Sequence, residues 1–171
     1  MKLLTLLLVL FSVQSWASAE QKAKALGLNL AEKGTPTANF VYAVKTGNLL
    51  FVSGHIPVDK KGKVVTGKLG KSLTTEQGAQ AARLAGESIL ATIKQELGSL
   101  DKVARLVKAT GMVNATAEFT QHSQVINGFS DLMVEVFGQQ GKHARAAVGM
   151  SSLPLDAAVE VELILEVKTD I

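Results

Sequence analysis

Two stretches of the chain repeat an apolar residue at every third or fourth position, which is the spacing of a helix with one buried face. In residues 74–97 the repeating positions are Ala82, Ala85, Ile89, Ile93 and Leu97. In residues 118–137 they are Phe119, Ile126, Phe129, Met133 and Val136. Thr74 or Thr75 suits the N-cap of the first helix, and Gly98 suits its end. The pattern predicts two long amphipathic helices.

Five other segments have the composition of β-strands. Residues 40–46 and 49–53 are separated by Gly47-Asn48, a pair that favours a tight hairpin. Three further β-rich segments are residues 103–114, 143–150 and 159–167, and a turn at residues 154–156 joins the last two. The order β-β-α-β-α-β-β predicts an α+β domain. Two helices cannot cover both faces of such a sheet, so we expect them together on one face.

The last predicted strand indicates what the two faces of the sheet are like. Its alternate residues Val159, Val161, Leu163, Leu165 and Val167 form a dry face that suits contact with the helices. The intervening residues are Glu160, Glu162, Ile164 and Glu166. Monomers rarely leave a broad mixed face of this kind uncovered, so we expect the chain to assemble through its helix-free face.

The first 19 residues have the pattern of a secretory signal peptide. Lys2 precedes a short apolar run, and Ala17-Ser18-Ala19 matches a small-x-small cleavage site. We expect cleavage between Ala19 and Glu20 and an exported protein, periplasmic or secreted; the alternative is an uncleaved N-terminal anchor. Residues 20–37 are predicted to be an irregular lead-in, and residues 38–171 a single domain.

Composition excludes several classes of function. The chain has 47% hydrophobic and 19% charged residues, as globular proteins do. Its net charge of +3 is spread along the chain, so nucleic-acid binding is not implied. It has no cysteine, which excludes disulfides, thiol nucleophiles and Cys-ligated zinc or iron–sulfur sites.

One charged residue stands out in the small-residue segment HARAAVGMSSLP. In an extended strand, Arg145, Ala147 and Gly149 share one face, and the more apolar even-numbered residues share the other. We therefore expect Arg145 to project from the helix-free face, beside small neighbours, where its planar fork suits a carboxylate. The alternative is a surface arginine paired with Glu160 or Glu162 of the next strand.

The segments HARAAVGMSSLPLDAAVEVELILEV, LLFVSGHIPVD and VINGFSDLMVEVFG resemble the reactive intermediate deaminase (Rid, YjgF-like or L-PSP-like) family over residues 38–168. The resemblance implies a chorismate mutase-like fold, a mixed sheet with two helices on one face, and homotrimers with clefts between subunits. It also implies hydrolysis of 2-imino acids such as 2-aminoacrylate to 2-keto acids and ammonia, without a cofactor or metal.

The resemblance assigns roles to individual residues. Arg145 matches the carboxylate-binding arginine, and Glu160 the glutamate that positions water. Ser53 and Gly54 match backbone that lines the cleft, and Asn127 a helix asparagine near it. Two further cleft positions depart from the family pattern, and they put the substrate range in doubt: Phe40 stands where a tyrosine is common, with Tyr42 two residues on, and Ala147 stands where a small polar residue or cysteine is common.

Other motifs and functions remain as alternatives. Residues 62–68 match most of a phosphate-binding loop, but Leu69 stands where Ser or Thr should hold magnesium. Asn114-Ala115-Thr116 is a glycosylation sequon. The histidines are His55, His122 and His143, with no metal-ligand spacing. His55 is a candidate for substrate contact or for a structural role in its loop. The main functional alternative is a non-catalytic module that binds a small carboxylate; a ribonuclease or translation inhibitor is disfavoured by the near-neutral mature charge.

Overall fold

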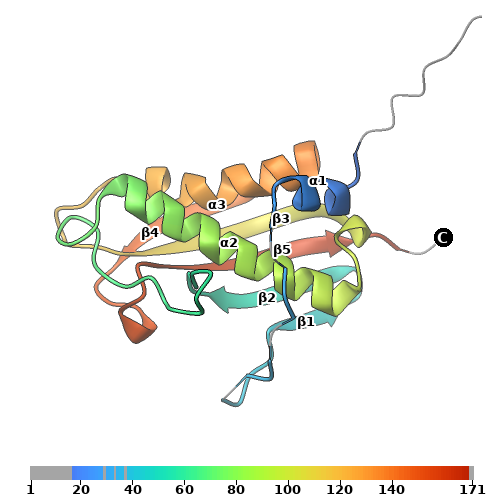
Figure 1. The fold of residues 1–171 in the computed structure, drawn as a ribbon, viewed down its shortest axis with the longest axis horizontal. Helices are drawn as coiled ribbons and strands as arrows, with labels where there is room; N and C mark the ends of the chain where they lie inside the picture. Colours follow the sequence, from blue (N-terminus) through green and yellow to red (C-terminus); the bar gives the residue numbers. More distant parts are fainter. Residues whose placement is uncertain (1–16, 29, 33, 37, 170–171) are drawn as a thin grey trace, which may run out of the picture.

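The computed structural model describes residues 17–28, 30–32, 34–36 and 38–169. Its strands form one sheet in the order β1-β2-β5-β3-β4 (Figure 1). They are β1 (Ala43–Thr46), β2 (Leu49–His55), β3 (Val103–Asn114), β4 (Ala144–Met150) and β5 (Val159–Val167). Neighbours are antiparallel except β3 and β4, which run parallel because a helix connects them as a crossover. The mixed sheet confirms the predicted fold class.

Two long helices, α2 (Thr75–Leu97) and α3 (His122–Phe137), lie side by side on one face of this sheet, as predicted (Figure 1). The Thr74 hydroxyl accepts the Gln77 N–H and the Gln77 side chain accepts the Thr74 N–H, so both ends of a capping box are present in α2. Gly98 ends α2 in a left-handed conformation. Helix α3 begins four residues later than predicted, because the Phe119 N–H bonds to the Thr116 carbonyl in a turn.

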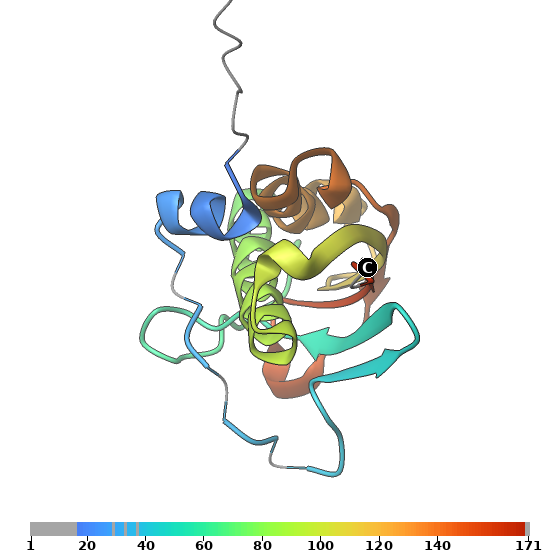
Figure 2. The ribbon, with the colours of Figure 1, turned by 90° about the vertical axis from the view of Figure 1, so that its right-hand side faces the viewer.

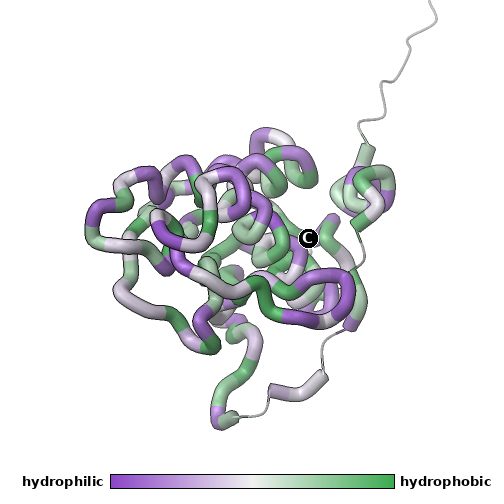
Figure 3. Tube along the Cα trace, turned by 60° about the vertical axis from the view of Figure 1, so that its left-hand side comes forward, coloured by the Kyte–Doolittle hydropathy of each residue, from purple (hydrophilic) through white to green (hydrophobic). Residues whose placement is uncertain are grey.

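The core lies between the two helices and the sheet. The five apolar residues predicted for the dry face of β5 are all buried. Hydrophilic and hydrophobic positions alternate along much of the chain, as expected for elements with one buried face (Figure 3). Two glycines make close approach possible. A Cβ on Gly111 of β3 would lie 2.5 Å from Ile126 of α3, and one on Gly128 of α3 would lie 1.9 Å from the Ala79 carbonyl oxygen of α2.

The segment predicted to be an irregular lead-in contains a helix, α1 (Ala19–Ala25), which packs beside α3 (Figure 2). Ser18 and Gln21 form its capping box, and Ala23 is buried. A seven-residue helix is not stable on its own, so these contacts with the rest of the domain stabilise it. The rest of the segment, as far as it is described, has neither helix nor strand.

The predicted signal peptide lies outside the described residues up to position 16. Its predicted cleavage point, between Ala19 and Glu20, falls in the first turn of α1. Among the described residues, no helix has the length and apolar character needed to cross a bilayer.

Candidate functional site

Arg145 lies on the helical face of β4, which corrects the expectation that it projects from the helix-free face. β4 is an edge strand whose register with β3 pairs Arg145 with Ala109 and Ala147 with Gly111. Ala109 is buried and Gly111 abuts Ile126 of α3, so this set of paired residues faces the helices. Val148, from the even-numbered set, is 41% exposed on the other face. The alternation was predicted correctly, but its direction was wrong.

Helix α3 holds the Arg145 guanidinium through three hydrogen bonds. Nη1 donates to Asn127 Oδ1 at 2.9 Å and to Ser130 Oγ at 3.0 Å, and Nη2 donates to the Ser123 carbonyl at 3.3 Å. A guanidinium has five N–H donors. Two therefore remain, one of them on Nε, on a side chain that is exposed to solvent. The arrangement is an oriented cationic fork with two N–H donors that helix α3 does not use.

The chain of contacts continues from Ser130 to His143. Ser130 Oγ lies 3.2 Å from His143 Nε2, and His143 Nδ1 lies 2.7 Å from the Gly141 carbonyl oxygen. Burial lowers the pKa of His143, and the nearby Arg145 lowers it further, against the Gly141 hydrogen bond, which raises it. We call Arg145, Asn127, Ser130 and His143 the arginine cluster.

Glu160 lies on the opposite face of the sheet, beside the bulge at the end of β2. Its neighbours along β5, Val159 and Val161, are buried under the helices, so Glu160 points to the helix-free side. A Cβ on Gly54 would lie 1.9 Å from Glu160 Oε1, so glycine at this position leaves the carboxylate in its observed place. Ser53 precedes Gly54, and its hydroxyl donates to the Val41 carbonyl at 2.7 Å. We call Glu160, Ser53 and Gly54 the glutamate cluster.

The environment of Glu160 opposes its ionisation. Burial raises the pKa of Glu160, and repulsion from Glu162, two residues along the same strand, raises it further. A carboxylate of this kind accepts a proton more readily at neutral pH than an ordinary surface glutamate does. The glutamate cluster therefore has the chemistry of a general base.

The predicted site residues thus form two groups in one chain. Arg145 and Asn127 are in direct contact, and Ala147 shares their face but is half-buried against the core. Phe40 lies nearer the glutamate cluster: its exposed ring packs edge-on against Tyr42 at 5.9 Å, and the Tyr42 carbonyl accepts the Ser53 N–H. Because Arg145 and Glu160 face opposite sides of the sheet, a single subunit does not bring them to one substrate.

His55 has a structural role. It is 3% exposed and faces the helices, with Nε2 at 2.7 Å from Thr92 Oγ1 and Nδ1 at 2.7 Å from the Ser53 carbonyl oxygen. His122 is half-buried, and its ring packs edge-on against Phe119. The sequon asparagine, Asn114, is fully buried and donates from Nδ2 to Asp156 Oδ1 at 2.9 Å. Within the described part of the chain, His, Asp and Glu side chains do not gather in groups of three or more that could hold a metal ion.

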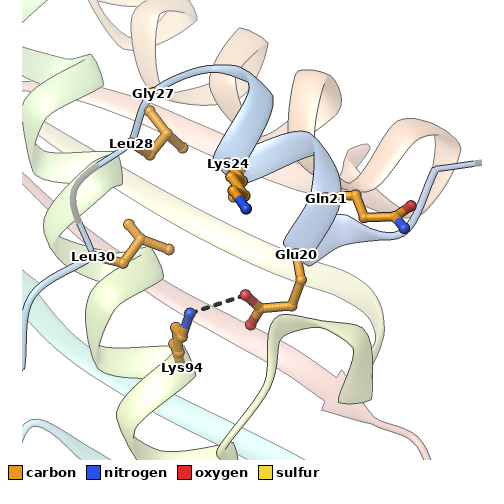
Figure 4. Close-up of a pocket in the computed structure, with 8 residues that line it drawn as sticks. Glu20, Gln21, Lys24, Gly27, Leu28, Leu30 and Lys94 are labelled. Atoms are coloured by element: carbon orange, nitrogen blue, oxygen red, sulfur yellow. Dashed lines mark hydrogen bonds and ion pairs between the residues drawn. The ribbon is translucent and has the colours of Figure 1, made fainter.

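Two hollows in the surface lie away from the arginine cluster. One of about 290 Å³ on the helix-free face is lined by Ser53, Phe51, Lys108 and Glu162, among others. Another, of about 540 Å³, lies between α1 and α2 (Figure 4). At its edge Glu20 accepts a hydrogen bond from Lys94 Nζ at 2.9 Å and another from the Leu100 N–H, which ties α1 to the domain.

Sequence reasoning missed Ser130 and His143 as neighbours of Arg145. Strand alternation could have predicted that His143 lies near Arg145, because residues 143 and 145 share a face in an extended segment. Ser130 follows Asn127 by three positions and so lies on the same side of α3. Both signals depend on knowing that this side of α3 meets this face of β4.

Comparisons of this chain with a family model, with curated proteins and with solved structures agree on one family. A family model described as "YjgF/chorismate mutase-like, putative endoribonuclease" matches residues 20–167. Protein TCP17 of Trypanosoma cruzi is 44% identical over 142 residues, 82% of this chain and 89% of that protein. RutC family protein PH0854 of Pyrococcus horikoshii is 33% identical over 129 residues, 75% of this chain and 87% of that protein. The crystal structure of Atu1372 from Agrobacterium tumefaciens, a protein of unknown function, is 41% identical with a TM-score of 0.78, over 88% of this chain and 92% of that one.

Proposed function

Because the chain belongs to the YjgF/RutC-like Rid family, we propose that it hydrolyses 2-imino acids to 2-keto acids and ammonia. The observation that carries this proposal is the guanidinium of Arg145, which α3 holds in place with two N–H groups left for a ligand. A substrate carboxylate suits that fork. The non-catalytic alternative uses the same contact to bind a small carboxylate without turnover.

The reaction needs few groups. A protonated imine is already electrophilic, so the site has to orient it and deliver water to the C=N carbon. Arg145 anchors the carboxylate, and Glu160 accepts a proton from the attacking water. The resulting tetrahedral intermediate loses ammonia after its nitrogen is protonated, and a C=O bond replaces C=N. One water enters, and one 2-keto acid and one ammonium leave.

We place this chemistry in clefts between the subunits of a homotrimer. The arginine cluster of one subunit and the glutamate cluster of a neighbour can then reach the same substrate, whereas a single chain holds them on opposite faces of its sheet. Large apolar side chains on the helix-free side, among them Val44, Phe51 and Val148, support such an assembly because a neighbour would cover them.

The predicted signal peptide supports export to the periplasm or the medium. A substrate met there has to come from a reaction class that releases imino acids outside the cytoplasm, such as amino-acid oxidation. The side chain of the physiological substrate would then be that of the amino acid which the oxidising enzyme takes.

The test is to generate a 2-imino acid with an amino-acid oxidase and to measure 2-keto acid and ammonia release with and without the protein. We expect acceleration by the wild type. Arg145→Ala should lower kcat/KM roughly 10- to 150-fold, because it removes a charge-assisted contact of about 1.5–3 kcal/mol. Arg83→Ala is the matched control, since Arg83 is a helix-surface arginine bound to Glu135.

Three results would contradict the proposal. Saturable binding of a 2-keto acid without faster hydrolysis would favour the non-catalytic module. RNA cleavage by a highly purified sample, lost in Arg145→Ala, would favour the nuclease activity that the family description names. Equal imine turnover by Arg145→Ala and Arg83→Ala would remove Arg145 from the mechanism.

A further inference from the structure

The hydrogen bonds of His143 have a defined direction. The Gly141 oxygen is a carbonyl and can only accept, so His143 Nδ1 carries the proton in this 2.7 Å contact. A neutral ring then has a bare Nε2. Ser130 therefore donates its hydroxyl proton to Nε2, and its oxygen lone pairs remain to accept from Arg145 Nη1. With a neutral imidazole, each of the three hydrogen bonds that link Gly141, His143, Ser130 and Arg145 has one donor and one acceptor.

The surroundings of His143 identify Arg145 as the charge to which it responds. Helix α3 contributes Ser130 and the Phe129 ring, which packs edge-on at 5.6 Å, and the segment before β4 contributes Gly141. These groups are uncharged. Arg145 is the charged group that acts on the imidazole, whereas the next acid along α3, Asp131, acts on Arg83.

Protonation of His143 reverses the direction of the hydrogen bond between Ser130 and His143. Nε2 becomes a donor, so the Ser130 hydroxyl can no longer donate to it and must rotate away. Ser130 Oγ is then approached by two cationic donors, the imidazolium and the guanidinium, which repel each other. Arg145 then shares its Ser130 acceptor with a second cationic donor and gains a like charge beside it, so this anchor to α3 is weakened.

We propose that His143 is a positioning residue that couples carboxylate binding at Arg145 to pH: the neutral imidazole orients the guanidinium through Ser130, and the protonated imidazole weakens that contact. This rests on the proposed function, because it takes the carboxylate of a 2-imino or 2-keto acid as the ligand. Burial and Arg145 lower the pKa of His143, so this weakening occurs in the acid range, below the ordinary histidine value. Above that range the site is fully assembled.

The first experiment measures binding of pyruvate, a 2-keto acid that stays ionised throughout, as a function of pH. In the wild type we expect Kd to rise roughly two- to tenfold as His143 becomes protonated, because one of the hydrogen bonds that orient Arg145 is weakened. His143→Gln should lose this pH-dependent step, since a glutamine oxygen can accept from Ser130 without titrating. His122→Gln is the matched control and should keep the step. An identical pH dependence in wild type and His143→Gln would overturn the proposal.

The second experiment needs no ligand and separates this proposal from the proposed function. NMR of the ligand-free protein should show His143 as the Nδ1–H tautomer and the Arg145 Nε–H resonance shifting along the His143 titration curve. In Ser130→Ala the Arg145 Nε–H resonance should no longer shift with the titration of His143. If this coupling is present but pyruvate does not bind, the proposed function fails and the positioning role stands. If the Arg145 resonance does not shift as His143 titrates, the positioning role fails.

Discussion

Glu160 shows how one residue can be prepared for proton transfer by its neighbours. Gly54 leaves space for its carboxylate, while burial and Glu162 raise its pKa. Raising the pKa of a carboxylate brings it toward neutral pH, which strengthens it as a general base. Glu162 is the part of this environment that a substitution can remove without touching Glu160 itself.

We expect Glu162→Gln to lower the pKa of Glu160, because a repelling charge is lost. In the imine hydrolysis assay, the acid limb of kcat/KM against pH should then move to lower pH. Glu166→Gln is the control: Glu166 lies on the same strand face but bonds to Asn48. A profile that is unmoved in Glu162→Gln, or moved equally in both variants, would argue against Glu160 as the base.

At the scale of the elements, the contact between α2 and α3 depends on Gly128. Alanine favours a helix over glycine by about 1 kcal/mol, so propensity alone would make Gly128→Ala stabilising. The added Cβ, however, would meet the backbone carbonyl of Ala79, which cannot move without shifting α2. Overpacking of this kind costs about 1–3 kcal/mol or more, and it should outweigh the propensity gain.

We therefore expect Gly128→Ala to lower the free energy of unfolding by at least about 1 kcal/mol. Denaturant unfolding followed by circular dichroism measures this change. Gln124→Ala, at an exposed position of the same helix, should leave stability within about 0.5 kcal/mol. A Gly128→Ala protein at least as stable as the wild type would show that α2 and α3 have room to separate.

The elements differ in how far the sequence determines them. Helix α2 was predictable because its capping residues and apolar stripe lie within its own sequence. The same holds for β5, whose buried face alternates clearly. The short α1 was not predictable, because its support comes from residues far along the chain, such as Lys94 and Leu100. The faces of β4 were assigned wrongly because both carry small or apolar residues, and only its register with β3 distinguishes them.

At the scale of the whole molecule, the helix-free face is the surface most in need of a partner. Phe51 is 39% exposed there, in register with Val44 of β1 and Ile164 of β5. The candidate site has the same need, since Arg145 and Glu160 lie on opposite faces of one chain. Residue identities predicted both clusters in part, but their separation became visible only with the strand register.

We expect Phe51→Asp to convert the proposed trimer into monomers, because it places a charge in an apolar contact surface. Light scattering coupled to size-exclusion chromatography measures the mass in solution. Imine hydrolysis should fall together with assembly, although Arg145 and Glu160 are unchanged. Lys45→Asp, on the same hairpin, is a control for the change of charge. A wild-type protein that is monomeric and active would contradict the intersubunit site.

The buried asparagine at the end of β3 has a practical consequence. Asn114 belongs to an N-x-T sequon, yet in the folded domain its amide is enclosed and bonded to Asp156. Oligosaccharide attached to that nitrogen during secretion from a yeast or insect cell would leave no room for this contact. Production of the recombinant protein should therefore use a bacterial host, where the sequon is not read.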